Sequence, residues 1–204
     1  EKKKDPGKMK QMGTGRSYTI KELASYSFLL EHFYIVDETT SMTKQDLNGT
    51  KLVTMDLSAK LGKEEPLVLI YHTHGSETYK KVNGKEGSVI EVGTALTKEL
   101  ENVYGIKTVH DKSVYDMVDG QLDRNAAYNF AGDSVEAALR KNPSVKVVID
   151  LHRDSVENNI HLRTKINGKS VAQIMFFNGV SRLASKGDIG YLYNPNKEAN
   201  LAFS

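Results

Sequence analysis

Two apolar runs, each followed by a segment rich in histidine and acidic residues, dominate the hydrophobic pattern of this chain. The first run, 67–71, leads into the polar segment 72–77, and the second, 145–149, leads into 150–154. The first run is continuous rather than alternating, which is typical of a strand buried in a parallel sheet, and the second run repeats the design of an apolar strand that ends in histidine amid carboxylates. Ligands bind beyond the carboxyl ends of such strands. We therefore expect the two polar segments to lie close together.

Periodic apolar positions predict three helices. The capping boxes that begin at Thr19 and at Ser88 predict helices over about 20–34 and 89–103. A third helix is predicted over 124–141 from its apolar spacing. The residues expected to face the core are Val92, Leu96 and Leu100 in the second helix, and Ala127, Phe130, Val135, Ala138 and Leu139 in the third.

The remaining apolar patterns predict strands. Alternation over 51–58 indicates an edge strand, and a short strand is expected over 106–109. The runs 160–166 and 171–177 flank Asn167-Gly168, a dipeptide typical of two-residue hairpin turns. Strands that alternate with helices indicate an α/β fold. We expect a mixed, mainly parallel sheet between helices.

Length and composition are those of a folded domain with a balanced charge. The chain has 204 residues, of which 39% are hydrophobic and 26% are charged. We expect an N-terminal extension with one helix over 1–50 and a single domain over 51–204. A net charge of +2 argues against nucleic acid as a partner. The lack of cysteine excludes a thiol nucleophile and any cysteine metal site.

The candidate chemistry lies in His74, Glu77 and His152. His74 and Glu77 are three residues apart on one loop, and His152 follows the second strand. Two imidazoles and one carboxylate form the ligand set of several zinc peptidases, which keep a further position for water. Zinc at such a site would acidify its water and polarise a scissile carbonyl.

The ligand assignment leaves alternatives open. His72 would face the same side as His74 on an extended strand, so either could be the ligand. Glu86 is the main rival to Glu77, whereas Glu91 is better explained as part of a helix cap.

Several neighbours of His152 have both a functional and a purely structural interpretation. Arg153 could hold a substrate carboxylate or stabilise an oxyanion, or it could pair with Asp154. Asp150 and Asp154 could orient the imidazoles, or they could be solvated carboxylates. Without a metal, His152 would simply be a strand-end histidine satisfied by one of these acids. Two histidines on other segments, His110 and His161, are expected to be incidental.

The segments 72–79 and 150–155, which read HTHGSETY and DLHRDS, resemble the stage II sporulation protein P family. The resemblance extends from about Leu67 to the C-terminus. It also includes Val92-Gly93, Gly105-Ile106, His110-Asp111 and the segment 166–170.

This resemblance implies a phosphorylase/hydrolase-like amidase fold and a zinc-dependent N-acetylmuramoyl-L-alanine amidase, with possible endopeptidase activity, that degrades peptidoglycan during spore engulfment. It implies His74 and His152 as zinc ligands with a glutamate completing the set. The implied partners are stage II sporulation proteins D and M. The implied location is extracytoplasmic, at the engulfment septum of a sporulating bacterium, with a membrane anchor outside this chain.

The sequence departs from the related amidases in two ways. Their glutamate ligand lies near the start of the first helix, which would correspond to about Glu86. Their general base is a second glutamate on a strand near the C-terminus, and this chain stops at Ser204 before such a strand. We therefore expect the general base beyond residue 204 and a sheet that lacks its last strand. The alternatives are a non-catalytic wall-binding or scaffold module and a zinc carboxypeptidase.

Overall fold

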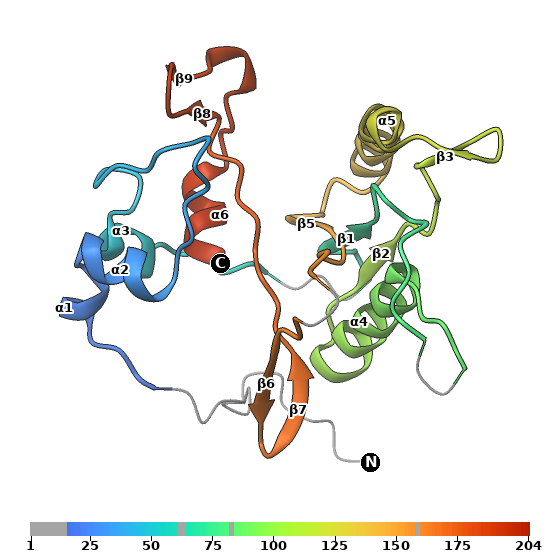
Figure 1. Ribbon diagram of the computed structural model, residues 1–204, viewed down its shortest axis with the longest axis horizontal. Coiled ribbons are helices and arrows are strands. Elements are labelled where there is room, and N and C mark those ends of the chain that lie inside the picture. The colour runs from blue at the N-terminus through green and yellow to red at the C-terminus, as the bar shows by residue number, and fades with distance from the viewer. Residues whose placement is uncertain (1–15, 61–63, 82–83, 158–159) are drawn as a thin grey trace. The chain divides into compact units, whose positions relative to one another are not determined.

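A computed structural model of the chain describes residues 16–60, 64–81, 84–157 and 160–204, which form two units (Figure 1). Unit 1 contains Ala59–His161, and unit 2 combines the described residues up to Ser58 with Leu162–Ser204. Residues 1–15 of the predicted extension lie outside the described part of the chain. The predicted boundary at residue 50 stays a prediction.

Unit 1 is built on a parallel sheet of three strands in the order β2-β1-β5. These strands are β1 (Val68–Tyr71), β2 (Thr108–His110) and β5 (Val147–Asp150). The register places Tyr71 opposite Asp150, so β1 and β5 end at the same level. The predicted adjacency of the two apolar strands is therefore confirmed, and the polar segments that follow them share one edge of the sheet.

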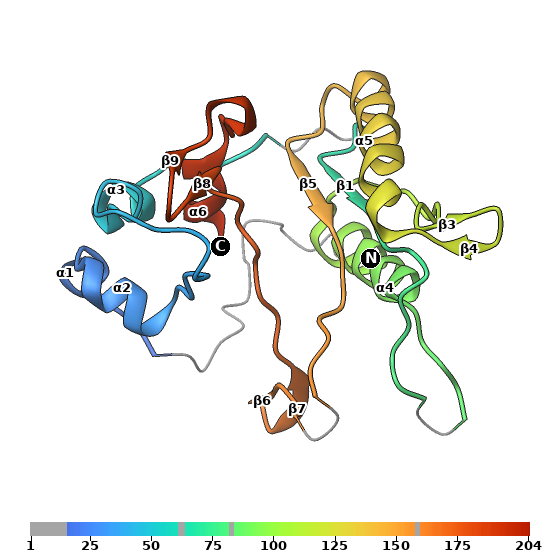
Figure 2. The same ribbon diagram turned by 45° about the horizontal axis from the view of Figure 1, so that its top comes forward.

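Helices α4 (Val89–Tyr104) and α5 (Arg124–Lys141) flank this sheet, as Figures 1 and 2 show. The connection from β1 through α4 leads to β2, whereas the connection from β2 through α5 passes β1 to reach β5. These two crossovers run in opposite directions across the sheet, and right-handed crossovers then place their helices on opposite faces. This arrangement confirms the α/β class. Between the helices, β3 (Met117–Val118) and β4 (Gln121–Leu122) form a small antiparallel pair.

Both long helices occur where the sequence predicted them, but their buried faces differ from the prediction. The capping box of Ser88 and Glu91 is present at the start of α4. In α4 the buried residues are Val89 and Gly93, whereas Val92 is exposed. Similarly, α5 buries Ala127 and Ala131, whereas Phe130 is exposed. The large apolar side chains of Val92 and Phe130 therefore did not mark the buried faces. Small residues occupy these faces instead, because they let the helices approach the sheet closely.

Unit 2 consists of short elements. They are α1 (Ile20–Leu23), α2 (Tyr26–His32), α3 (Gly49–Val53), β6 (Arg163–Ile166), β7 (Lys169–Ala172), β8 (Arg182–Leu183), β9 (Gly187–Asp188), the 3-10 helix η1 (Gly190–Leu192) and α6 (Lys197–Phe203).

Two predictions in unit 2 are wrong. The single helix over 20–34 is broken into α1 and α2, because the Ser25 side chain caps a new helix by accepting from the backbone N–H of Phe28. The edge strand over 51–58 is instead α3 followed by irregular chain. Asn48 caps α3 through the backbone N–H of Lys51, a local signal that outweighs the alternating apolar pattern.

The hairpin at Asn167-Gly168 is confirmed. Both turn residues have positive φ angles, 51° and 77°, as a type I′ turn requires. Strands β6 and β7 pair antiparallel with each other and form a two-stranded sheet of their own. Within the described residues, the sheet of unit 1 is thus wholly parallel.

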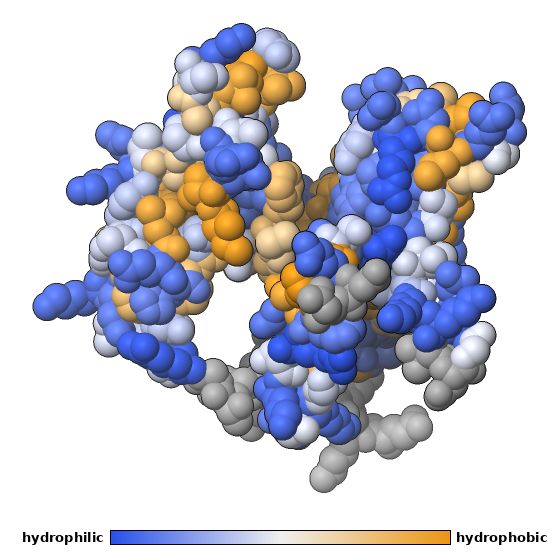
Figure 3. Space-filling model, viewed as in Figure 1, coloured by the Kyte–Doolittle hydropathy of each residue, from blue (hydrophilic) through white to orange (hydrophobic). Residues whose placement is uncertain are grey.

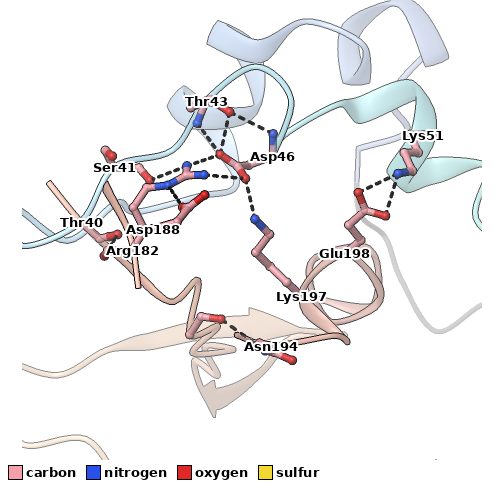
Figure 4. Close-up of polar contacts among 11 residues, drawn as sticks. Thr40, Ser41, Thr43, Asp46, Lys51, Arg182, Asp188, Asn194, Lys197 and Glu198 are labelled. Atoms are coloured by element: carbon pink, nitrogen blue, oxygen red, sulfur yellow. Dashed lines mark hydrogen bonds and ion pairs between the residues drawn. The ribbon is translucent and has the colours of Figure 1, made fainter. Parts of the chain in front are cut away.

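A buried carboxylate joins the two sequence-distant parts of unit 2 (Figure 4). Asp46 accepts hydrogen bonds from Thr43, Arg182 and Lys197. Burial alone would raise the pKa of Asp46, but these donors hold it well below its ordinary value. The apolar core beside it is formed by Leu29, Leu47, Leu52 and Leu201.

Unit 2 also carries large apolar side chains on its surface. Ile35, Ile174 and Phe177 are each at least 85% exposed. Figure 3 shows apolar patches on the visible face of this unit. Among the described residues, no helix combines the length and the apolar character that crossing a membrane requires.

Candidate metal centre

The loop after β1 is folded into a tight turn that brings two candidate ligands to the same side. The backbone N–H of Glu77 donates to the carbonyl of His74 at 3.1 Å. Both residues are buried, with exposures of 7% for Glu77 and 8% for His74. A local hydrogen bond thus joins the backbones of these two residues, which are three positions apart in the sequence.

His152, two residues beyond β5, completes a cluster with His74 and Glu77. Each of the three residues offers one ligand atom, and these atoms lie within 4.8 Å of one another. Nδ1 of His152 is 3.8 Å from Oε2 of Glu77. The rings of His74 and His152 meet edge to face, with centroids 5.1 Å apart. The sequence predicted that these residues lie at the ends of neighbouring strands, and in the fold they lie close together.

Asp150 holds the imidazole of His152. Nε2 of His152 lies 2.9 Å from Oδ2 of Asp150, and the same carboxylate accepts from the backbone N–H and the hydroxyl of Thr73. The hydrogen bond to Asp150 raises the pKa of His152 despite burial. Because the carboxylate of Asp150 accepts from Nε2, the neutral imidazole has its proton on Nε2 and its lone pair on Nδ1, the nitrogen that faces Glu77. Metal-binding histidines commonly have such a carboxylate behind them.

The carboxylate of Glu77 is held between two arginines. Oε2 accepts from the backbone N–H of Arg153 at 3.2 Å, and Oε1 lies 3.3 Å from Nη1 of Arg124. Oε2 is also the oxygen that faces His152. Each oxygen of Glu77 thus has a fixed direction.

A second buried carboxylate fixes the loop from behind. Asp116, which is fully buried, accepts from the backbone N–H of Ser76 at 3.1 Å and from its hydroxyl at 2.6 Å. Gly75 lies so close to the neighbouring loop that a Cβ atom there would be 2.9 Å from the carbonyl oxygen of Ser113. These contacts leave the turn of 73–76 little freedom to rearrange.

The rival ligands are engaged elsewhere. The side chain of Glu86 accepts from the hydroxyl of Thr78 at 2.9 Å, and Glu91 accepts from the backbone N–H of Ser88 in the helix cap. The ring of His72 contacts the carbonyl of Leu151 through Nδ1 and His110 through Nε2, each at 2.9 Å. Among the described residues, the cluster of possible metal ligands therefore contains His74 and Glu77, and these alternatives lie outside it.

His110, which was expected to be incidental, lies outside the cluster and forms a half-buried pair with His72. Its Nδ1 is buried and has no hydrogen-bond partner in the described part of the chain. Burial lowers the pKa of His110 to about 4, and repulsion from His72 and Lys112 acts in the same direction. His161, by contrast, is exposed and lies outside the cluster.

This pair makes the stability of the chain sensitive to acid. The unfolded chain protonates His110 near its ordinary pKa of 6.5, whereas the folded chain does so near 4. The contribution to stability that is present above pH 6.5 is therefore lost as the pH falls towards 4, by at most about 3 kcal/mol. We expect urea unfolding to show a smaller loss in His110→Gln over this range. Parallel stability curves for the two proteins would contradict this prediction.

Arg124 is the residue of this region that the sequence interpretation missed. It is the first residue of α5, where its positive charge opposes the helix dipole, and this unfavourable placement was the available signal. Its carbonyl lies 3.4 Å from Nε2 of His74, and its guanidinium contacts Glu77. Arg153 contacts the carbonyl of Asp154 at 3.5 Å rather than its carboxylate.

The donor set fits a metal ion. Two imidazoles and one buried carboxylate suit zinc or a similar divalent ion, and the second hydrogen bonds of His152 and Glu77 are those expected around such an ion. The fold and the cluster together define an α/β protein with a candidate single-metal centre at the carboxyl ends of adjacent parallel strands. The profile of the stage II sporulation protein P family matches residues 6–204, and the chain belongs to this family.

One curated relative supports this assignment. Stage II sporulation protein P of Bacillus subtilis (strain 168) is 28% identical over 127 residues, which cover 57% of this chain and 31% of the relative. This chain thus spans about a third of the length of that relative. No solved structure was found to match the chain. Membership of this family implies a role in sporulation.

Proposed function

We propose that this chain carries the metal centre of a zinc-dependent N-acetylmuramoyl-L-alanine amidase that cleaves peptidoglycan during spore engulfment. The observation that carries the proposal is the cluster of buried His74, buried Glu77 and half-buried His152. The family assignment supports the same conclusion. Bound zinc would supply a water of lowered pKa and polarise the amide carbonyl between the lactyl group and alanine.

The protein's own residues prepare the site for this chemistry. Asp150 orients His152, and the amide of Arg153 together with the guanidinium of Arg124 orients Glu77. Among the described residues, the carboxylates at the cluster are Glu77, which is a proposed ligand, and Asp150, which orients His152. We therefore propose that the general base is a glutamate beyond residue 204. Arg153 is proposed to contact substrate from the edge of the cluster.

The cellular setting is also a proposal. We propose an extracytoplasmic location at the engulfment septum, with a membrane anchor outside this chain, and the family assignment supports the sporulation setting. We further propose stage II sporulation proteins D and M as partners, as the sequence resemblance implies. Co-purification of this protein with D and M from sporulating cells would test the partners.

Metal content and dye release from labelled sacculi test the enzyme proposal. We expect about one zinc ion per chain, and release of intact stem peptides by a longer protein that extends beyond residue 204. The chain of 204 residues should bind zinc but release dye more slowly. Equal activity of the two proteins would reject a general base beyond residue 204.

The same assay distinguishes the alternatives. Zinc binding without dye release, even in the longer protein, would support a wall-binding or scaffold module. Release of single terminal residues, detected by mass spectrometry, would indicate a zinc carboxypeptidase.

A further inference from the structure

Arg124 lies between the buried cluster and the solvent. Its Nη1 is 3.3 Å from Oε1 of Glu77, yet its side chain is 49% exposed while that of Glu77 is only 6% exposed. A guanidinium has five N–H donors in a planar fork. One edge of the fork is therefore directed at Glu77, and donors remain on the exposed part.

The position of Arg124 at the start of α5 destabilises the helix unless another group compensates its positive charge. Asp123 caps α5 by accepting from the backbone N–H groups of Asn125 and Ala126. The first turn of a helix favours negative charge, so an arginine at its first position is unfavourable for the helix itself. The charge of Arg124 is instead compensated by Glu77 of the cluster.

A second arginine, Arg153, directly follows the proposed ligand His152 in the chain. The backbone of Arg153 contacts Glu77, and its Nε is buried without a hydrogen-bond partner in the described part of the chain. The side-chain contact from its Nη1 to the carbonyl of Asp154 is long at 3.5 Å. The guanidinium of Arg153 therefore has a donor, Nε, that no group in the described part of the chain accepts from.

We propose that Arg124, with Arg153, binds a carboxylate of the peptide substrate next to the metal centre. This inference rests on the proposed amidase function and adds to it a substrate class, peptides with a free internal carboxylate. The planar fork of arginine matches a carboxylate through two parallel hydrogen bonds. Because Arg124 also holds Glu77, one side chain would link the position of the substrate to that of the metal ligand.

The test compares two ligands that differ in one group. In N-acetylmuramoyl-L-alanyl-D-glutamate the α-carboxylate of glutamate is free, and in N-acetylmuramoyl-L-alanyl-D-isoglutamine an amide takes its place. The γ-carboxyl group of both ligands is blocked as its methylamide, so that the α-position alone differs. Calorimetry on the zinc-loaded chain should show about tenfold tighter binding of the free acid, the effect of one charge-assisted contact. In Arg124→Gln this preference should disappear, and in Arg124→Lys it should be reduced, because lysine lacks the planar fork.

Arg140→Gln is the matched control. Arg140 lies on the same helix and is exposed, with a surface ion pair to Glu136. The Arg140→Gln variant should keep the full preference for the free acid. Zinc content is measured for each variant, so that loss of the metal is not mistaken for loss of the carboxylate contact. Should Arg124→Gln fail to fold, Arg124→Lys still tests the inference, since an unchanged preference in it would overturn the two-bond contact.

The outcomes separate this inference from the proposed function. Equal binding of the two ligands by the unsubstituted chain, or an unchanged preference in Arg124→Gln, overturns the carboxylate contact while leaving amidase activity intact. Absence of peptide release from sacculi in the longer protein overturns the proposed function itself.

Discussion

Replacement of Glu77 by glutamine is expected to lower the affinity of the chain for zinc by at least about 100-fold, because loss of a ligand should exceed the 10–100-fold effect of losing an outer partner. The amide of glutamine has nearly the same shape but lacks the negative charge that the cluster presents to a cation. The carboxylate is buried, so solvent cannot replace it easily. Zinc competition with a fluorescent chelator would measure the change.

Glu86→Gln is the matched control for this experiment. Glu86 was the main rival as third ligand, and its side chain contacts Thr78 instead of the cluster. Its replacement should leave zinc affinity within about twofold, since surface substitutions away from a site have small effects. Loss of zinc in Glu86→Gln with retention in Glu77→Gln would show that the loop rearranges on binding and would overturn the ligand assignment.

Replacement of Gly93 by alanine is expected to destabilise the protein by about 2 kcal/mol. A Cβ atom at this position would lie 2.7 Å from Nε2 of His110 and 2.8 Å from Cε1 of His72. His72 is fully buried and tied to the carbonyl of Leu151, so its ring has no room to withdraw. Overpacking typically costs about 1–3 kcal/mol, and the better helix propensity of alanine offsets at most about 1 kcal/mol of it. Urea unfolding measures the difference.

Gly132→Ala in α5, by contrast, is expected to stabilise the protein. A Cβ atom at Gly132 meets nothing within 4 Å, and the residue is exposed within α5. Only the helix propensity should act there, so we expect stabilisation by about 0.5–1 kcal/mol. Equal stability of the two alanine variants would mean that the rings of His72 and His110 move to accommodate the added methyl group.

The candidate site was predictable where it depends on local rules. The continuous apolar runs identified β1 and β5, and the strand ends placed His74, Glu77 and His152 at one edge. The capping box at Ser88 likewise fixed the start of α4. Each of these signals acts over a few residues and does not require knowledge of the packing.

The parts that were missed depend on contacts between distant segments. Arg124 reaches Glu77 across 47 residues, and His110 meets His72 across 38. No local sequence pattern predicts either of these two contacts. The short helix α3 was missed for a different reason, because its alternating apolar residues favoured a strand and only the cap at Asn48 indicated a helix.

The interrupted layout of unit 2 has a consequence for the order in which the chain can fold. The core of unit 2 needs Leu201 as well as Leu29 and Leu47, and the segment Ala59–His161 of unit 1 lies between Leu47 and Leu201 in the sequence. During vectorial synthesis, the strands and helices of unit 1 are complete before Leu201 has been made. The earlier half of unit 2 must therefore wait, with its leucines exposed to solvent, until residue 201 has emerged.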